Sequence, residues 1–253
     1  MGRNITQRTF QKYTLVGNGR VARHIKQYLS LLGLPVNQWS RGQNVPLTEI
    51  LSHSSHVLLL ISDSAIEDFV RSHKVLEDYT VVHFSGALSS SLAYSTHPPF
   101  AFGPETYPLD VYERIPFVLE KDSPGFEQLL PGLQNPHYEI DPALKPLYHS
   151  YCVLSGNFTT LLWQRFCDQL ETQFHLPRTI ALPYLQSVYT NLQTHDGNAL
   201  TGPLSRGDTL TIQKNLNALK NDPFQKIYQA FVSSYQEIEL LKGKDRNPHH
   251  GDL

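Results

Sequence analysis

Short runs suited to β-strands alternate with amphipathic stretches over the first half of the chain. Runs at residues 13–16, 36–41, 56–61, 80–84, 115–120 and 137–140 predict strands, and stretches with helical spacing at residues 22–32, 46–52, 65–74 and 125–132 predict helices. The run at 56–61 is almost wholly apolar, which is typical of a strand buried on both faces of a parallel sheet. Strands that alternate with helices indicate parallel βαβ units with right-handed crossovers.

The second half of the chain has a helical pattern throughout. Asp141 and Pro142 supply an N-cap and a first-turn proline, and a broad apolar face follows from Leu144 to Leu162. Further helices are predicted at 182–193 and from Asp208 and Asp222 onward, whereas the serine- and proline-rich stretch 88–108 predicts a loop. We therefore expect an α/β fold: a Rossmann-like, mostly parallel sheet domain at 1–141 and an all-helical domain at 142–253. Residues 1–12 and 242–253 are predicted to be a polar lead-in and a polar tail.

A glycine-rich turn joins the first strand to the first helix. Gly17 would allow the tight turn, Gly19 would let backbone N–H groups approach a pyrophosphate, and Ala22 would let the helix pack closely on the strand. Glycines also gather in ordinary tight turns, but the strand before and the helix after favour a dinucleotide site, with the anion at the helix N-terminus. The predicted cofactor loop is Gly17, Asn18, Gly19, Arg20, Val21 and Ala22.

The end of the second strand indicates which cofactor this is. An NAD site usually carries an acid there to hold the ribose 2′-hydroxyl, but no acid occurs between Gly17 and Glu49. Ser40 and Arg41 instead offer a hydroxyl and a planar cation that suit a 2′-phosphate, and Arg20 could add a second cation. A solvated surface arginine is the alternative interpretation of Arg41. The pattern favours NADP over NAD.

Polar residues follow two of the predicted central strands. Ser62 and Asp63 come after the strand at 56–61, and Ser85 and Gly86 after the strand at 80–84. Because ligands of doubly wound folds bind outside the carboxyl ends of the strands, we expect all four residues at the cofactor crevice. Asp63 is also suited to the N-cap of the next helix.

Composition narrows the class of protein. The chain has 253 residues, of which 40% are hydrophobic and 17% charged, so it is long enough for one large or two smaller globular domains. A formal net charge of −2 argues against a nucleic-acid binder, and two cysteines without ligand spacing predict neither a disulfide framework nor a metal site. We find no membrane-spanning run or signal-peptide core, so we expect a cytoplasmic protein without nucleic-acid or membrane partners.

Three stretches carry a resemblance to a known superfamily. They are Phe84–Ser89, Lys145–His149 and Ala199–Asp208. With the glycine loop, they resemble a branch of the 6-phosphogluconate dehydrogenase-like superfamily, which includes hydroxyacid dehydrogenases, ketopantoate reductases and pyrroline-carboxylate reductases. In proteins of that branch, the second half of the chain is a domain of unknown function. The resemblance implies an NADP-dependent oxidoreductase fold that forms dimers through its helical half.

The resemblance also indicates catalytic candidates. Related hydroxyacid dehydrogenases place a Lys and an Asn four residues apart on the first helix of the second domain, and this chain has Lys145 and His149 at that spacing. Lys145 could donate a proton to a carbonyl oxygen or hold a substrate anion, or it could be a solvated first-turn lysine. His149 and His97 could be proton donors, or core or capping histidines.

Two further residues are predicted to bind substrate. Asn157 lies farther round the same helix, and Arg206 at a helix entrance could clamp a carboxylate or phosphate, or could instead fix its own loop. The sequence therefore predicts a homodimeric NADP(H)-dependent dehydrogenase or reductase that acts on a small polar hydroxy, keto or imino acid-like substrate in the cleft between its domains. The alternatives are a non-catalytic NADP(H) sensor and a purely structural dimerisation protein, although the latter leaves the glycine loop unexplained.

Overall fold

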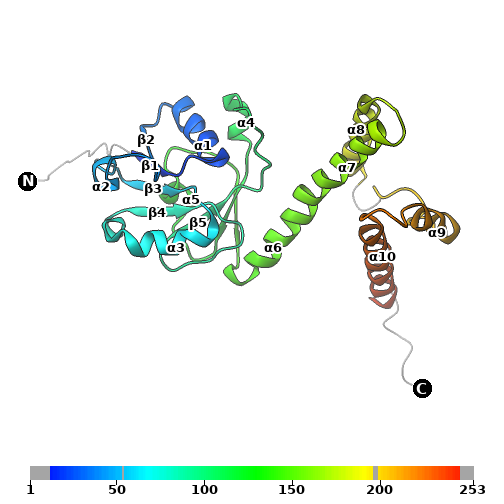
Figure 1. Cartoon of the computed structure of the whole chain (residues 1–253). Coiled ribbons are helices and arrows are strands. Elements are labelled where there is room, and N and C mark those ends of the chain that lie inside the picture. Colours follow the sequence, from blue (N-terminus) through cyan, green and yellow to red (C-terminus); the bar gives the residue numbers. More distant parts are fainter. Residues whose placement is uncertain (1–11, 53, 196–198, 246–253) are drawn as a thin grey trace, which may run out of the picture. The chain divides into compact units, whose positions relative to one another are not determined.

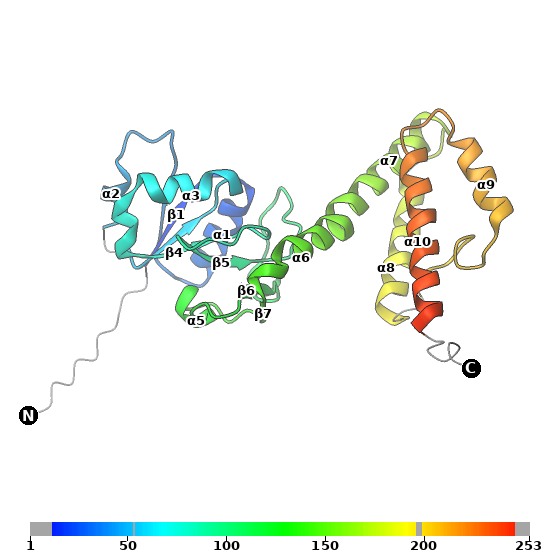
Figure 2. The same ribbon diagram turned by 90° about the horizontal axis from the view of Figure 1, so that it is seen from below.

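The computed structural model describes residues 12–52, 54–195 and 199–245, so most of the predicted lead-in and the end of the predicted tail lie outside the described residues. Seven strands form one sheet (Figures 1 and 2): β1 (Tyr13–Val16), β2 (Val36–Trp39), β3 (His56–Leu59), β4 (Thr80–His83), β5 (Tyr94–His97), β6 (Phe117–Glu120) and β7 (His137–Ile140). The helices around the sheet are α1 (Arg20–Leu31), α2 (Leu47–Ile50), α3 (Asp63–Ser72), η1 (Lys74–Asp78), α4 (Leu109–Glu113) and α5 (Phe126–Leu129).

The order of the strands is β2-β1-β3-β4-β5-β6-β7. The first five strands run parallel, β6 runs antiparallel to β5, and β7 runs parallel to β6. The mostly parallel Rossmann-like sheet predicted from the sequence is thereby confirmed. The strand order reverses between β1 and β3, which is the point where open α/β sheets bind their ligands.

Two apolar clusters cover the two faces of the sheet, and α1 and α3 lie on opposite sides of it (Figure 1). Because successive side chains of a strand point to opposite faces, Leu58 of β3 packs with α1, α4 and α5, whereas Val57 and Leu59 pack with α2, α3 and η1. The short central strands are thus buried on both sides, as their apolar sequences predict.

The stretch 88–108 differs from the predicted loop. Residues Tyr94–His97 form β5, whose backbone pairs with β4 through Tyr94 and Ser95 and with β6 through Thr96 and His97. Helix α4 was also not predicted. The loop prediction was wrong for β5 because its pairing partners lie elsewhere in the chain and its own sequence has no apolar run.

The helix-start predictions have different outcomes. Asp141 accepts a hydrogen bond from the Ala143 amide, so its predicted cap is confirmed. Asp208, where a helix was predicted to begin, is the N-cap of α9 and accepts a hydrogen bond from the Thr211 amide. The prediction that Asp63 caps α3 was wrong, since Ser62 holds the cap position and Asp63 is the first residue of the helix. The Asp63 carboxylate accepts a hydrogen bond from Ser85 instead.

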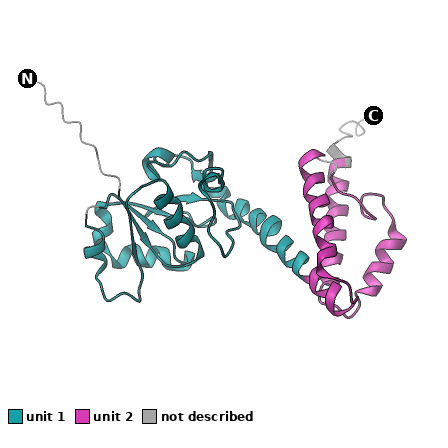
Figure 3. Ribbon diagram, turned by 90° about the horizontal axis from the view of Figure 1, so that it is seen from above, with its two compact units in different colours: residues 1–164 teal, residues 165–253 magenta. Residues whose placement is uncertain are grey.

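The second half is helical, as predicted: η2 (Pro142–Leu144), α6 (Lys145–Cys152), the π-helical segment η3 (Val153–Phe158), α7 (Thr159–Thr172), η4 (Arg178–Ile180), α8 (Ala181–Thr194), α9 (Thr209–Ala218) and α10 (Gln225–Asp245). The chain divides into two compact units (Figure 3), residues 1–164 and 165–253, so the division lies within α7. The first unit extends past residue 141 and includes α6, whose Lys145 and Tyr148 side chains contact β5 of the sheet. Within the second unit, Arg165 pairs with Asp222 and lies over the ring of Phe224.

Among the described residues, none of the helices combines the length and the apolar character needed to cross a lipid bilayer.

Candidate functional site

A cleft of about 950 Å³ opens at the carboxyl ends of β1, β3 and β4. This volume is within the range of small-molecule and cofactor sites. The predicted cofactor residues that line it are Gly17, Asn18, Gly19, Arg20, Val21, Ser40, Arg41, Ser62, Asp63 and Ser85. The cleft therefore gathers ten of the twelve predicted cofactor residues, from segments that are far apart in the sequence.

The glycine loop has the geometry that its sequence predicts. Gly17 has a φ of 122°, and a Cβ there would lie 2.3 Å from the carbonyl oxygen of Leu60. Gly19 is the N-cap of α1, and a Cβ added to it would meet nothing within 4 Å. Ala22 is fully buried against the sheet rather than lining the cleft. The first turn of α1 thus faces open space, where an anion can approach its N–H groups.

The end of β2 carries the two residues predicted to hold a 2′-phosphate. Ser40 is half-buried and Arg41 is exposed, and both line the cleft. Arg20 lines the cleft too, and its guanidinium donates a 3.4 Å hydrogen bond to the carbonyl oxygen of Phe102. Arg20 therefore ties the loop after β5 to the start of α1 as well as adding a positive charge.

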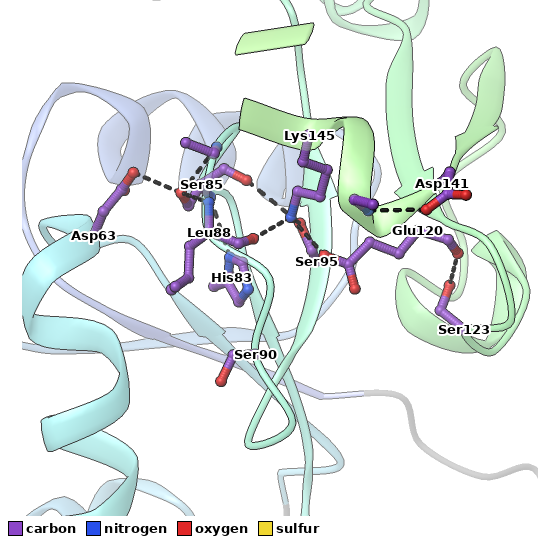
Figure 4. Close-up of polar contacts among 12 residues, drawn as sticks. Asp63, His83, Ser85, Leu88, Ser90, Ser95, Glu120, Ser123, Asp141 and Lys145 are labelled. Carbon is purple, nitrogen blue, oxygen red and sulfur yellow. Dashed lines mark hydrogen bonds and ion pairs between the residues drawn. The ribbon is translucent and has the colours of Figure 1, made fainter. Parts of the chain in front are cut away.

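Ser85 organises the turn that follows β4 (Figure 4). Its hydroxyl donates to the Asp63 carboxylate at 2.5 Å and accepts from the backbone amides of Ala87 and Leu88 at 3.3 and 3.0 Å. Ser85 and Asp63 both line the cleft. One hydroxyl thus fixes the turn and joins it to the first residue of α3.

Gly86 lies beneath two imidazoles. A Cβ on Gly86 would lie 2.7 Å from Nδ1 of His149 and 2.9 Å from Nε2 of His97. The two rings are 5.5 Å apart and nearly perpendicular, and the His97 Nδ1 lies 2.9 Å from the hydroxyl of Tyr148. Gly86 is buried and does not line the cleft, and its lack of a side chain leaves room for the two histidines. Its predicted contact with a cofactor stays a prediction.

His97 is the member of this group that reaches the cleft. It lines the cleft, whereas His149 and Lys145 do not. Burial, followed by the charges of His149 and Lys145, lowers the pKa of His97 from 6.5 to about 4. Burial also raises the pKa of Tyr148, so its hydroxyl keeps its proton at neutral pH. His97 is therefore a neutral imidazole that contacts a protonated phenol.

Lys145 is buried beside the sheet, and its side chain is 3% exposed. Its ammonium donates to Oε1 of Glu120 at 2.7 Å, to Oγ of Ser95 at 2.6 Å and to the carbonyl oxygen of Leu88 (Figure 4). The interpretation of Lys145 as a solvated first-turn lysine was therefore wrong. Its predicted catalytic role stays a prediction, and all three hydrogens of its ammonium have partners within the first unit.

The two predicted substrate-binding residues lie on different compact units. Asn157 is exposed on η3 in the first unit, and Arg206 is exposed in the turns before α9 in the second. Around Arg206 the chain is fixed by backbone bonds from Gly207 to Leu204 and from Asp208 to Pro203. Both roles stay predictions. Within the described part of the chain, no group of three or more His, Cys, Asp or Glu side chains is placed to hold a metal ion.

Several residues of the site were not predicted from the sequence. The cleft is also lined by Trp39, Gly42, Asp68, Phe69, Ser72, Phe84, Pro98, Phe100 and Phe102. Tyr148 and Glu120 were likewise missed as partners of His97 and Lys145. The sequence contains an indication for Tyr148, because this residue lies inside the Lys145–His149 stretch that carries the resemblance. It contains none for Glu120, which looks like the ordinary end of a strand.

Comparisons with known proteins agree with this geometry. Residues 115–235 match the model of a domain of unknown function, DUF2520. No curated protein sequence is significantly similar to the chain. A Bacteroides fragilis protein described as a candidate NADP oxidoreductase is similar in structure, with a TM-score of 0.71 at 20% identity over 90% of this chain and 99% of that protein.

Two further solved structures share the architecture. An imine reductase of Streptomyces aurantiacus has a TM-score of 0.62 at 14% identity, over 90% of this chain and 94% of its own. A pyrroline carboxylate reductase of Plasmodium falciparum, solved with NADP bound, has a TM-score of 0.56 at 11% identity, over 90% and 97%. Residues 115–235 thus match DUF2520, and the chain shares the fold of Rossmann-like reductases with a helical C-terminal part, which is the architecture that its motifs predict.

Proposed function

We propose that the protein is an NADP(H)-dependent oxidoreductase that transfers a hydride to or from a small hydroxy, keto or imino acid-like substrate. The cleft at the β1–β3 switch point carries this proposal, because it combines a glycine loop with the open N-terminus of α1 and with Ser40 and Arg41. The descriptions of two similar structures, a candidate NADP oxidoreductase and an NADP-bound pyrroline carboxylate reductase, support the cofactor.

The residues at the cleft fit a dinucleotide. A Cβ on Gly17 would collide with the carbonyl oxygen of Leu60, so only glycine allows this tight turn. Nothing lies within 4 Å of the Cβ position of Gly19, as the approach of a pyrophosphate requires. Arg41 and Ser40 offer charge-assisted and hydroxyl hydrogen bonds to a 2′-phosphate. A bound nicotinamide supplies or accepts the hydride.

His97 is the proposed hydrogen-bond donor to the reacting C=O or C=N group. When hydride reaches the carbon of a C=O or C=N bond, negative charge develops on the oxygen or nitrogen, and an N–H donor lowers that barrier. If the Tyr148 hydroxyl donates to Nδ1 of His97, the ring carries its hydrogen on Nε2. A neutral imidazole of lowered pKa can serve as such a donor. His149 stands behind His97, with its Nδ1 buried and without a hydrogen-bond partner among the described residues.

Arg41→Ala is expected to weaken NADPH binding about ten- to a hundredfold and to leave NADH binding nearly unchanged. A hydrogen bond to a charged group contributes about 1.5–3 kcal/mol, and NADH lacks the 2′-phosphate that Arg41 would contact. Fluorescence or thermal-shift titration with both nucleotides measures the effect. The matched control is Arg71→Ala, which removes an exposed arginine of α3 that does not line the cleft.

Equal affinity of the wild-type protein for NADPH and NADH would contradict the NADP assignment. Tight NADPH binding without turnover across a broad carbonyl and imine panel would instead favour a nucleotide sensor.

The helical face of the first unit is expected to form a homodimer interface. Large apolar side chains with helical spacing are exposed along α6, η3 and the start of α7: Leu147, Tyr151, Leu154, Phe158 and Leu161. Exposed apolar side chains in this number mark an interaction surface, and a closed two-fold dimer is the commonest way to cover one. Sedimentation velocity at micromolar concentration should give a dimer, and Leu147→Lys with Leu154→Lys should give a monomer.

The control for the dimer is Val45→Lys, which places a lysine at an exposed apolar residue in a loop of the same unit. A monomeric wild-type protein, or a double variant that stays dimeric, would contradict the proposed interface.

A further inference from the structure

The start of α6 is tied to three separate parts of the sheet domain by one side chain. The Lys145 ammonium contacts the carbonyl oxygen of Leu88 in the turn after β4, Oγ of Ser95 on β5 and Oε1 of Glu120 at the end of β6 (Figure 4). Glu120 is 13% exposed, so the pair is largely removed from water. An ammonium has three hydrogens, and each has an acceptor here, so none is left to donate to a substrate.

The contacts of Lys145 continue to the cofactor cleft. The Ser95 hydroxyl accepts a hydrogen bond from Lys145 and donates one, 3.4 Å long, to the carbonyl oxygen of Ser85. The Ser85 hydroxyl holds both the Leu88 amide and the Asp63 carboxylate. The turn from Ser85 to Leu88 is therefore bonded at one end to the wall of the cleft and at the other end to Lys145.

Helix α6 also sets the position of the histidine pair. Lys145 contacts Ser95, and Tyr148, three residues farther along α6, contacts His97, two residues farther along β5. Two residues of a strand span about 6.6 Å, so the ammonium lies well behind the imidazole that lines the cleft. His149, one helical turn after Lys145, packs against Gly86 within the turn that Lys145 holds.

We propose that Lys145 is a positioning residue, which with Glu120 locks α6 and the Ser85–Leu88 turn together so that Tyr148 and His149 are held against His97. This inference rests on the proposed function only in assigning His97 to the chemistry. The lock itself is a property of the free protein and is tested without substrate.

The first test measures the stability of the full-length protein by urea denaturation. Lys145→Met leaves the Glu120 carboxylate buried without its partner, so the folding equilibrium constant should fall at least about a hundredfold. Adding Glu120→Leu removes the second charge and should restore much of that loss, to within about tenfold of wild type. Arg114→Met, which breaks the exposed pair with Asp110, is the matched control and should change the constant by less than about fivefold.

The second test uses a signature that a purely structural pair would not change. In the folded double variant, the ¹⁵N signals of the His97 imidazole should shift because its bond with Tyr148 loosens, and NADPH affinity should fall about two- to thirtyfold. His97→Gln assigns the signals. Ser95→Ala, which removes one small acceptor of Lys145, should shift the same signals less and serves if the double variant does not fold.

The results separate the proposals. The positioning role would be overturned if Lys145→Met were as stable as Arg114→Met. It would also be overturned if the His97 signals were unchanged in the double variant or in Ser95→Ala. If the wild-type protein did not bind NADPH, the proposed function would be wrong. Urea denaturation and the ¹⁵N signals of His97 would still decide the role of Lys145.

Discussion

Gly17→Ala is expected to lower the free energy of unfolding by about 2–6 kcal/mol and to abolish detectable NADPH binding. Gly17 has a φ of 122°, which a side chain rarely tolerates, and the added Cβ would lie 2.3 Å from the Leu60 carbonyl oxygen. That contact is with backbone, and Leu60 is itself hydrogen-bonded to Val16. Relief therefore requires β1 and β3 to separate at the point where the cleft opens. Urea denaturation and NADPH titration measure the two effects.

Gly19→Ala separates the effect on stability from the effect on NADPH binding. Gly19 has a φ of −70° and open space around it, so alanine there should cost little stability. The methyl group would nevertheless occupy the approach of a pyrophosphate to α1, so binding should weaken. If Gly17→Ala were as stable as Gly19→Ala, the close approach of β3 would not be the constraint on this turn.

Acidification from pH 7 to pH 5 is expected to remove about 2 kcal/mol of stability for each of two buried histidines. Burial is the main cause that lowers the pKa of His83 and of His97 from 6.5 to about 4. As the pH falls through 6.5, the unfolded chain takes up protons on both rings, but the folded protein does so only near pH 4. The stabilisation is thus complete above pH 6.5 and declines down to about pH 4. Burial lowers the pKa of His56 too, so it acts in the same direction.

His83→Asn is the control for this pH dependence. Nδ1 of His83 accepts a 3.2 Å hydrogen bond from the Ser85 amide, and the side-chain oxygen of asparagine can take its place without titrating. The variant should lose a large part of the slope between pH 7 and pH 5 while it keeps the turn after β4. Equal unfolding free energies of the wild-type protein at the two pH values would show that these rings are protonated as readily in the folded state.

The cofactor cleft could be predicted from the sequence because its signals are local. Gly17 and Gly19 follow a strand and open a helix, so a few neighbouring residues determine both the conformation and the place of the turn. Ser62 and Ser85 follow apolar runs, which are typical of central strands in a parallel sheet. The topology of a parallel sheet then brings these strand ends together without any knowledge of side-chain contacts.

The rest of the site depends on contacts between distant residues. Strand β5 forms because β4 and β6 offer backbone partners on both sides, a condition that the residues of Tyr94–His97 do not reveal. Lys145 looked like a free helix-start cation, and only the fold brings Glu120 and Ser95 to its ammonium. Asp63 was misassigned as a cap for the same reason, since its carboxylate bonds with Ser85 from the next strand end.

The π-helical segment η3 gives this fold an adjustable coupling between α6 and α7. A π turn holds about one residue more than an α turn, so it is equivalent to a single-residue insertion in a continuous helix. Deleting one residue there would restore the α-helical period and change the facing of every later side chain by about 100° about the helix axis. The contacts of Lys145 and Tyr148 with the sheet precede the segment and would be unaffected. Single-residue insertions or deletions in η3 would thus turn the later residues of this helix about its axis, while the residues of the cofactor cleft keep their contacts.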